Sequence, residues 1–396
     1  MPNRPPSPEM AEFAAQFGGV IERGSDAPFG ADTFFDPAYA RGIKTLDDFV
    51  GQRNPCGLIF KYDIQLFDNL SPNAVCGLVG ERFCIGVNLG MHQKIIEIAS
   101  LICNFYFLPE ESLGSRLGQT AGTGFKYIDI LTNSQEPEKD YPKFLHSLIE
   151  RVADAKHVDK FVYLTNSLLL FVIHHEIRHA TEGHVQFFNQ KRGETRGPIF
   201  LGETGSNIPG AQEDSELWIP YLFELDADAK AFLTIAENIL AGHLLIVESA
   251  LSSYERLKLV WIGTLLLANT WSLAEEKEPK LGHTHPPGLL RMLSLSRLPT
   301  RADLLEELRR VLAGDEPKGA MVQLYNEGAR FAQGVRGLNE EFLGLYAIFT
   351  QDAWDYYVKI FYDPDALEFD SRLKSLREQF IYEPKTLVVP RAHAAR

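Results

Sequence analysis

The sequence predicts a mostly helical α+β fold with a small N-terminal sheet and a helical C-terminal region. Two β-rich runs, residues 57–66 and 83–88, lie in the first quarter of the chain. A helical period of apolar residues starts at 95–107 and dominates from about residue 141 onward. The 396 residues, 45% of them hydrophobic, suffice for a substantial core and for two or three subdomains.

The chain divides into four parts on this basis. Residues 1–20 are rich in proline and are expected to form a mobile tail. The remaining parts are an N-terminal α/β part over 21–140, a helical region with the chemical motifs over 141–300, and a C-terminal helical region over 301–396. Within them, residues 108–143 are predicted to form a loop, and the glycine-rich segment 191–218 to be either a lid or simply disordered.

Composition restricts the class of protein. The net charge of −14 argues against nucleic acid or an anionic membrane surface as the main partner. The cysteines show no CxxC pair and are predicted to be reduced, mostly buried thiols: Cys56, Cys76, Cys84 and Cys103. The N-terminus lacks the hydrophobic core of a signal peptide. The longest apolar stretch, 259–274, is short for a membrane span and is expected to be a buried helix. We therefore expect a soluble, cytoplasmic protein.

Residues 175–179 read His-Glu-Ile-Arg-His and follow an apolar run that is predicted to be helical. On a helix, residues i and i+4 lie one above the other, so His175 and His179 can direct a ring nitrogen at the same metal ion. Glu176 lies about 100° round the helix from His175, beside such an ion rather than on it. A general base for metal-bound water belongs at that position, so the motif predicts a zinc hydrolase.

A coincidental HExxH on a helix face is the alternative, because the pattern fixes only three positions. The apolar run 168–173 directly before it predicts a buried helix, in which unpaired histidine and glutamate side chains would be costly. A bound metal ion would satisfy these side chains, which favours a genuine site.

A third ligand is required, and the segment 221–230 offers two carboxylates on one helix face. Glu224 and Asp228 are four residues apart, whereas Asp226 points away from their face. Glu224 can complete a two-histidine, one-glutamate set that leaves a position for water, and Asp228 can hold the free N–H of a ligand histidine. An acidic surface turn is the alternative, but the apolar neighbours of these residues leave little solvated face.

The HExxH motif followed by Glu-x-x-Ala-Asp resembles the gluzincin metallopeptidases of the HtpX and CAAX-prenyl-protease type. The resemblance implies a zincin-like catalytic core over 141–300, with His175, His179 and Glu224 as zinc ligands. It also implies that Glu176 is the catalytic base and that Asp228 supports the site. His184 matches a further histidine of the pattern HExxHxxxxH, and residues 285–291 match His-Pro-Pro-x-x-x-Arg.

The resemblance covers about 120 residues and has departures. Arg178 stands where these families commonly have glycine, and their members are usually anchored by several transmembrane helices. A soluble chain with this layout also resembles the phage-exclusion peptidases of the Lit type, which implies a role in phage defence. A metzincin fits poorly, because Glu182 and Val185 stand where that pattern needs glycine and histidine.

These observations predict a zinc-dependent endopeptidase that hydrolyses a peptide bond of a protein substrate, with Glu176 activating the metal-bound water. The candidates for the oxyanion donor are His285, Arg291 and Tyr221. His285 is favoured by the His-Pro-Pro match, although it could instead cap the helix that Pro286 begins. The strand 83–88 is the candidate for pairing with an extended substrate.

Two other functions stay open. The chain could be a zinc hydrolase of a non-peptide bond with the same ligands. It could also be a non-catalytic sensor or binding protein on a gluzincin scaffold, for instance if His285 closes the site as a fourth ligand. His184 turns away from the ligand face of a regular helix, so we expect it to support a ligand or to lie on the surface rather than to bind metal. The substrate protein, its cleavage site and the oligomeric state cannot be predicted.

Overall fold

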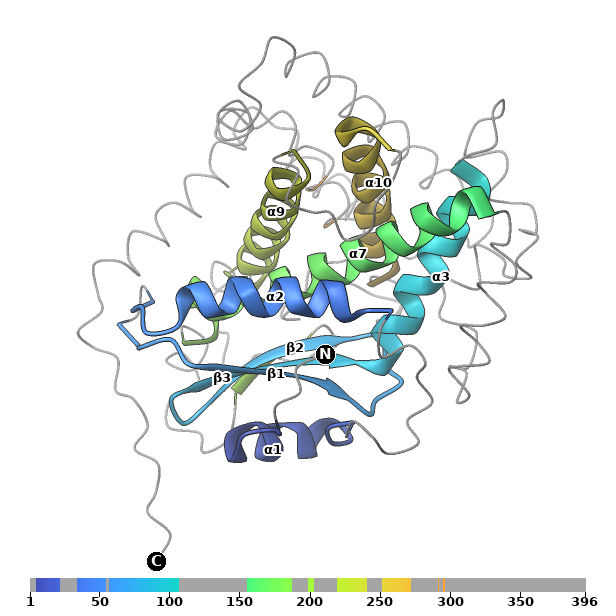
Figure 1. Ribbon diagram of the computed structural model, residues 1–396. Helices are drawn as coiled ribbons and strands as arrows, with labels where there is room; N and C mark the ends of the chain where they lie inside the picture. Colours follow the sequence, from blue (N-terminus) through green and yellow to red (C-terminus); the bar gives the residue numbers. More distant parts are fainter. Residues whose placement is uncertain are drawn as a thin grey trace, which may run out of the picture.

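The fold is mostly helical with one small sheet, as the α+β prediction requires (Figure 1). The computed structural model describes the following residues: 5–21, 34–54, 57–106, 155–186, 199–202, 219–240, 251–271, 291 and 295. The sheet has a short helix on one face and the longer helices on the other (Figure 1). The predicted loop 108–143 and the C-terminal region 301–396 lie outside the described residues.

The sheet has four strands in the order β1-β3-β2-β4. Their bounds are Tyr62–Phe67 for β1, Ala74–Val79 for β2, Arg82–Asn88 for β3 and Ile199–Gly202 for β4. Strands β1 and β3 are parallel, whereas β2 is antiparallel to both β3 and β4. The β2–β3 hairpin turns at Gly80, whose φ of +59° is a left-handed conformation that glycine adopts at little cost.

Strand β3 lies inside the sheet, so the prediction that residues 83–88 pair with a substrate is wrong. Both edges of β3 are occupied, one by β1 and the other by β2. The edges of the described sheet are β1 and β4. Strand β4 also corrects part of the predicted loop 191–218, because its residues continue the sheet next to β2. The rest of that loop, including the predicted lid, lies outside the described residues.

In the described part of the chain, five long helices lie on the other side of the sheet (Figure 1). They are α2 (Asp36–Phe49), α3 (Leu89–Tyr106), α7 (Ala155–Thr181), α9 (Ile219–Leu240) and α10 (Ser253–Trp271). Helix α7 lies at the centre and packs against the other four and against strands β2 and β3. The close approach of α2 to α7 needs Gly42, since a Cβ there would lie 2.6 Å from Cγ2 of Ile173.

Residues 8–17 are not a mobile tail, contrary to the prediction for residues 1–20. They form helix α1 (Pro8–Ala14) and a following 3₁₀ turn on the far face of the sheet. Ser7 caps the helix by accepting a hydrogen bond from the Met10 N–H, and its own N–H donates to Asp63 at 2.8 Å. Met10 and Phe13 are fully buried against β-strand residues. Proline at the first helical position therefore starts a packed helix here.

The expected thiols and the apolar segment are confirmed where the structure describes them. Cys76, Cys84 and Cys103 are buried free thiols. The apolar segment forms helix α10, with its central residues in the core. None of the helices in the described part of the chain has the length and apolarity that a bilayer crossing requires.

Candidate metal centre

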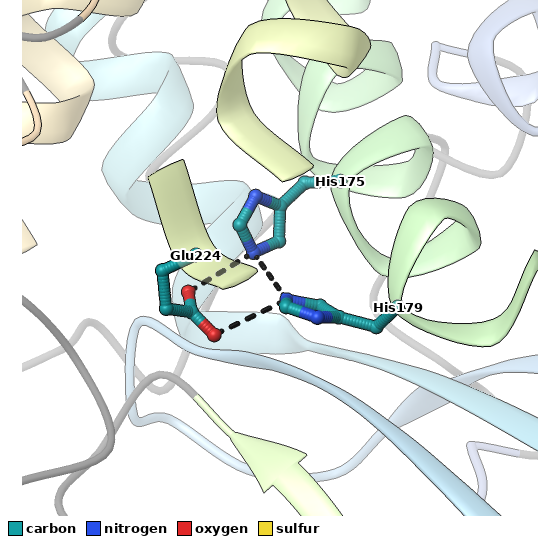
Figure 2. A group of neighbouring side chains, drawn as sticks. All are labelled: His175, His179 and Glu224. Carbon is teal, nitrogen blue, oxygen red and sulfur yellow. Dashed lines mark hydrogen bonds and ion pairs between the residues drawn. The ribbon is translucent and has the colours of Figure 1, made fainter. Parts of the chain in front are cut away.

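Helices α7 and α9 bring three ligand-type side chains together beside the sheet (Figure 2). His175 and His179 lie one turn apart on α7, and their Nε2 atoms are 2.9 Å apart. Glu224 on α9 faces both rings, with Oε2 3.3 Å from Nε2 of His175 and Oε1 3.2 Å from Nε2 of His179. Each of the three side chains is only 1% exposed. The residues that the sequence assigned to the metal thus converge on one point.

The ligand-type atoms of the three side chains lie close enough together to share one metal ion. Zinc ligands lie roughly 2.0–2.1 Å from the ion, and a regular tetrahedron of that radius has edges of about 3.3–3.4 Å. The two Nε2 atoms lie 2.9 Å apart, and each lies at 3.2 or 3.3 Å from a different oxygen of Glu224. Two imidazoles and a carboxylate are a usual donor set for catalytic zinc. The group could therefore bind a metal ion, and its chemistry suits zinc.

The two histidines have pKa values shifted in opposite directions. Burial alone would lower the pKa of His175, but its contacts with Asp228 and Glu224 raise that pKa well above the ordinary value. Burial lowers the pKa of His179 to about 3, against the attraction of Glu224. His179 is therefore neutral at pH 7, which is the form of imidazole that binds a metal ion.

Asp228 and Arg291 lie behind His175. Oδ1 of Asp228 is 2.9 Å from Nδ1 of His175, on the side of the ring opposite the ligand group. The Arg291 guanidinium binds the same carboxylate with two hydrogen bonds, from Nε at 2.8 Å and from Nη2 at 2.6 Å. Although burial opposes it, this guanidinium together with His175 holds the pKa of Asp228 below its usual range. A carboxylate in this position orients a ligand histidine and fixes its tautomer.

The sequence made Arg291 a candidate for the oxyanion donor. Its two hydrogen bonds to Asp228 indicate instead that it holds this carboxylate in place. Its Nη1 is 3.9 Å from Oε2 of Glu224, so the guanidinium also lies close to the third ligand-type side chain. A buried arginine needs a carboxylate partner, but the burial of Arg291 is visible only in the structure, so no signal in the sequence indicated its pairing with Asp228. The other two candidates, His285 and the side chain of Tyr221, lie outside the described residues.

Glu176 is buried next to the ligand-type histidines, on the side of α7 that faces strand β2. Its side chain is 1% exposed. Burial raises the pKa of the Cys76 thiol on β2, and the negative charge of Glu176 raises it further. The carboxyl of Glu176 therefore lies within electrostatic range of β2. Its role as general base stays a prediction.

A second polar group surrounds His184, just beyond the end of α7. Nδ1 of His184 is 3.1 Å from Nδ1 of His179, and its Nε2 is 3.7 Å from Oδ2 of Asp226. Asp226 in turn contacts Lys230 at 3.3 Å. As predicted, Asp226 is not on the face of α9 that carries Glu224, and the HExxH pattern gave no reason to connect it to His184.

Two residues in or next to the motif, Arg178 and His174, face other helices. Arg178 makes the predicted i,i+4 contact with Glu182, at 3.6 Å, and also donates to Oγ1 of Thr234 at 2.7 Å. His174 is fully buried, and burial lowers its pKa to about 3. Both lie away from the ligand-type group, as their positions on the helix predict.

Compared with protein-family models, with curated proteins and with solved structures, the chain gives no match.

Proposed function

We propose that this chain is a zinc-dependent endopeptidase that hydrolyses a peptide bond of a protein substrate. The observation that carries the proposal is the buried convergence of His175, His179 and Glu224, with Glu176 directly after His175 on α7. The peptide bond is the inferred target because the motifs resemble those of gluzincin peptidases. A zincin-like core, zinc as the metal and a protein as the substrate are parts of the same proposal.

Each side chain has a task in this reaction. His175, His179 and Glu224 would hold the ion, and Asp228 keeps the His175 ring in place through its contact at 2.9 Å. Zinc, when bound, lowers the pKa of the water it carries and polarises the scissile carbonyl. Glu176 accepts a proton at its carboxylate and passes it to the leaving amine. A buried site favours this transfer because charges interact more strongly away from water.

A non-catalytic sensor would need a closed metal site. Structural zinc sites usually have four protein ligands, whereas catalytic sites have three and leave one position open. Within the described residues, the group contains three donors, His175, His179 and Glu224. A carboxylate beside the group, such as Glu176, has no task in a structural site. The presence of Glu176 therefore favours catalysis, and the sensor alternative depends on whether His285 is a fourth ligand.

The first experiment measures metal content. We expect close to one zinc per chain in wild-type protein purified without chelator, and loss of that zinc in His179→Ala. His92→Ala is the matched control, because His92 is equally buried but lies on α3, hydrogen bonded to Tyr39. Wild-type protein that neither contains zinc nor takes it up would refute the proposal.

The second experiment tests the reaction. Zinc-loaded protein is incubated with a peptide mixture derived from a whole proteome, and new termini are identified by mass spectrometry. Wild type should create termini that Glu176→Gln does not create. Zinc-loaded wild type that cuts neither this mixture nor intact proteins of the same proteome would contradict the peptidase proposal and favour a non-peptide bond.

A further inference from the structure

His179 has two ring nitrogens with different surroundings. Nε2 belongs to the ligand-type group, whereas Nδ1 lies 3.1 Å from Nδ1 of His184. A metal ligand must present a lone pair at Nε2, so the hydrogen of a neutral His179 ring lies on Nδ1. The Nδ1 atom of His184 is then the acceptor. His184 consequently carries its own hydrogen on Nε2.

The surroundings of His184 favour this tautomer. Its Nε2 faces the Asp226 carboxylate, with 3.7 Å between Nε2 and Oδ2, which is an electrostatic contact rather than a hydrogen bond. Asp226 is 4% exposed, so its charge is weakly screened. The ring of His184 stacks on Phe223, with 4.3 Å between centroids and 15° between planes. The imidazole is thus held both by stacking and by charge.

The backbone conformation explains why the side chain of His184 contacts that of His179. On a regular helix, a residue five positions beyond His179 would point well away from it. Helix α7 instead ends at Thr181, and Gly183 has a φ of +84°. Glycine adopts this left-handed conformation readily, and the chain turns there. His184 therefore lies next to Nδ1 of His179, with 5.2 Å between the ring centroids.

A fourth-ligand role for His184 does not fit this geometry. Its Nδ1 approaches Nδ1 of His179, whereas the ligand-type group gathers around Nε2, across the ring. His184 thus contacts the His179 ring at Nδ1, the nitrogen that does not face the ligand-type group. Asp228 has the corresponding position behind His175.

We propose that His184 is a positioning residue that fixes the tautomer and ring orientation of His179 for metal binding. Its anchor is Asp226, which contacts Lys230 at 3.3 Å, and Lys230 also contacts Glu182 at 2.6 Å. This group joins the end of α7 to α9, the two helices that carry the ligand-type side chains. The inference rests on the metal site of the proposed function but does not depend on which bond is cleaved.

Two substitutions of similar size separate hydrogen bonding from packing. His184→Asn keeps an acceptor oxygen near the position of Nδ1, whereas His184→Leu removes it. The dissociation constant of zinc is measured by competition with a chromophoric chelator. We expect His184→Leu to weaken zinc binding by about 10–100-fold and His184→Asn to retain most of the affinity. The control is His92→Leu, which removes a buried imidazole on α3 and should leave the affinity unchanged.

A second measurement needs no variant and holds even where His184→Leu does not fold. Long-range nitrogen–proton NMR of the zinc-loaded wild type reports the tautomer of each ring. We expect the hydrogen of His179 on Nδ1 and that of His184 on Nε2. Wild-type zinc affinity in folded His184→Leu, an equal loss in His92→Leu, or a hydrogen on Nδ1 of His184 would each overturn the inference.

These outcomes are distinct from failure of the proposed function. Zinc binding that depends on His184, in a protein that cleaves no peptide, would contradict the peptidase and leave the inference standing. Peptide cleavage by the wild type, together with unchanged zinc affinity in His184→Leu, would support the peptidase and overturn the inference. A wild type that takes up no zinc overturns both, and the wild-type titration alone reveals that case.

Discussion

Arg291 binds Asp228 through one edge of its guanidinium, Nε and Nη2, with hydrogen bonds of 2.8 and 2.6 Å between residues 63 positions apart in the chain. Both side chains are essentially inaccessible to water. The same Asp228 oxygen that accepts from Nη2 of Arg291 lies 2.9 Å from Nδ1 of His175. Arg291 therefore acts on the candidate metal centre through Asp228.

Replacing Arg291 should cost stability because it leaves a buried carboxylate without its counter-charge. We expect Arg291→Met to lower the free energy of unfolding of chelator-treated protein by about 3–5 kcal/mol. Urea denaturation followed by circular dichroism measures the change. The double variant Arg291→Met with Asp228→Leu should recover part of the loss, because no buried charge then remains unpaired. A double variant as unstable as the sum of the single ones would show that the pair does not act as a unit.

The ligand-type group could be predicted from the sequence because the spacing of its members on each helix is set locally. The spacing of His175 and His179 follows from the helix period, and that of Glu224 and Asp228 does too. No local rule relates α7 to α9, so their contact through Glu224 had to be inferred from the need for a third ligand. The tertiary position of His184 was not predictable, since it depends on where α7 ends and on the left-handed Gly183.

The predictions of a mobile N-terminal tail, of a loop at residues 199–202 and of substrate pairing by residues 83–88 failed for a different reason. Proline content suggested a tail, but Met10 and Phe13 supply an apolar face that the sheet buries. Strand β4 has four residues in a glycine-rich segment, too few to show a period of two. The interior place of β3 depends on pairing between distant segments, which its own residues do not encode.

Phe13 tests whether helix α1 belongs to the folded core. Its ring is fully buried and packs against Phe17 and Phe67, with centroid distances of 5.1 and 6.0 Å. We expect Phe13→Ala to lower the free energy of unfolding by about 3–5 kcal/mol. The exposed neighbour Glu12 is the control, and Glu12→Ala should stay within about 0.5 kcal/mol of wild type. Equal stability of both variants would mean that α1 contributes nothing to the core.

Glu176 is the residue whose loss should separate metal binding from catalysis. Glu176→Gln keeps the size of the side chain and removes the basic carboxylate. We expect zinc content to stay at the wild-type value and turnover of an identified peptide to fall by about 10²–10⁴-fold. Zinc is measured by atomic emission and turnover by chromatography of the products. Undiminished cleavage by the variant would remove Glu176 from the mechanism.

Removal of the Glu224 carboxylate should weaken zinc binding. Its two oxygens lie 3.3 and 3.2 Å from the Nε2 atoms of His175 and His179, so its removal opens one corner of the ligand set. We expect Glu224→Ala to lose zinc during dialysis against a weak chelator that leaves the wild type loaded. Glu97→Ala is the control, because this carboxylate on α3 pairs with Lys94. Zinc retained by Glu224→Ala would assign the third ligand to Asp228 or to His285, and measuring zinc in Asp228→Ala and His285→Ala would then decide between them.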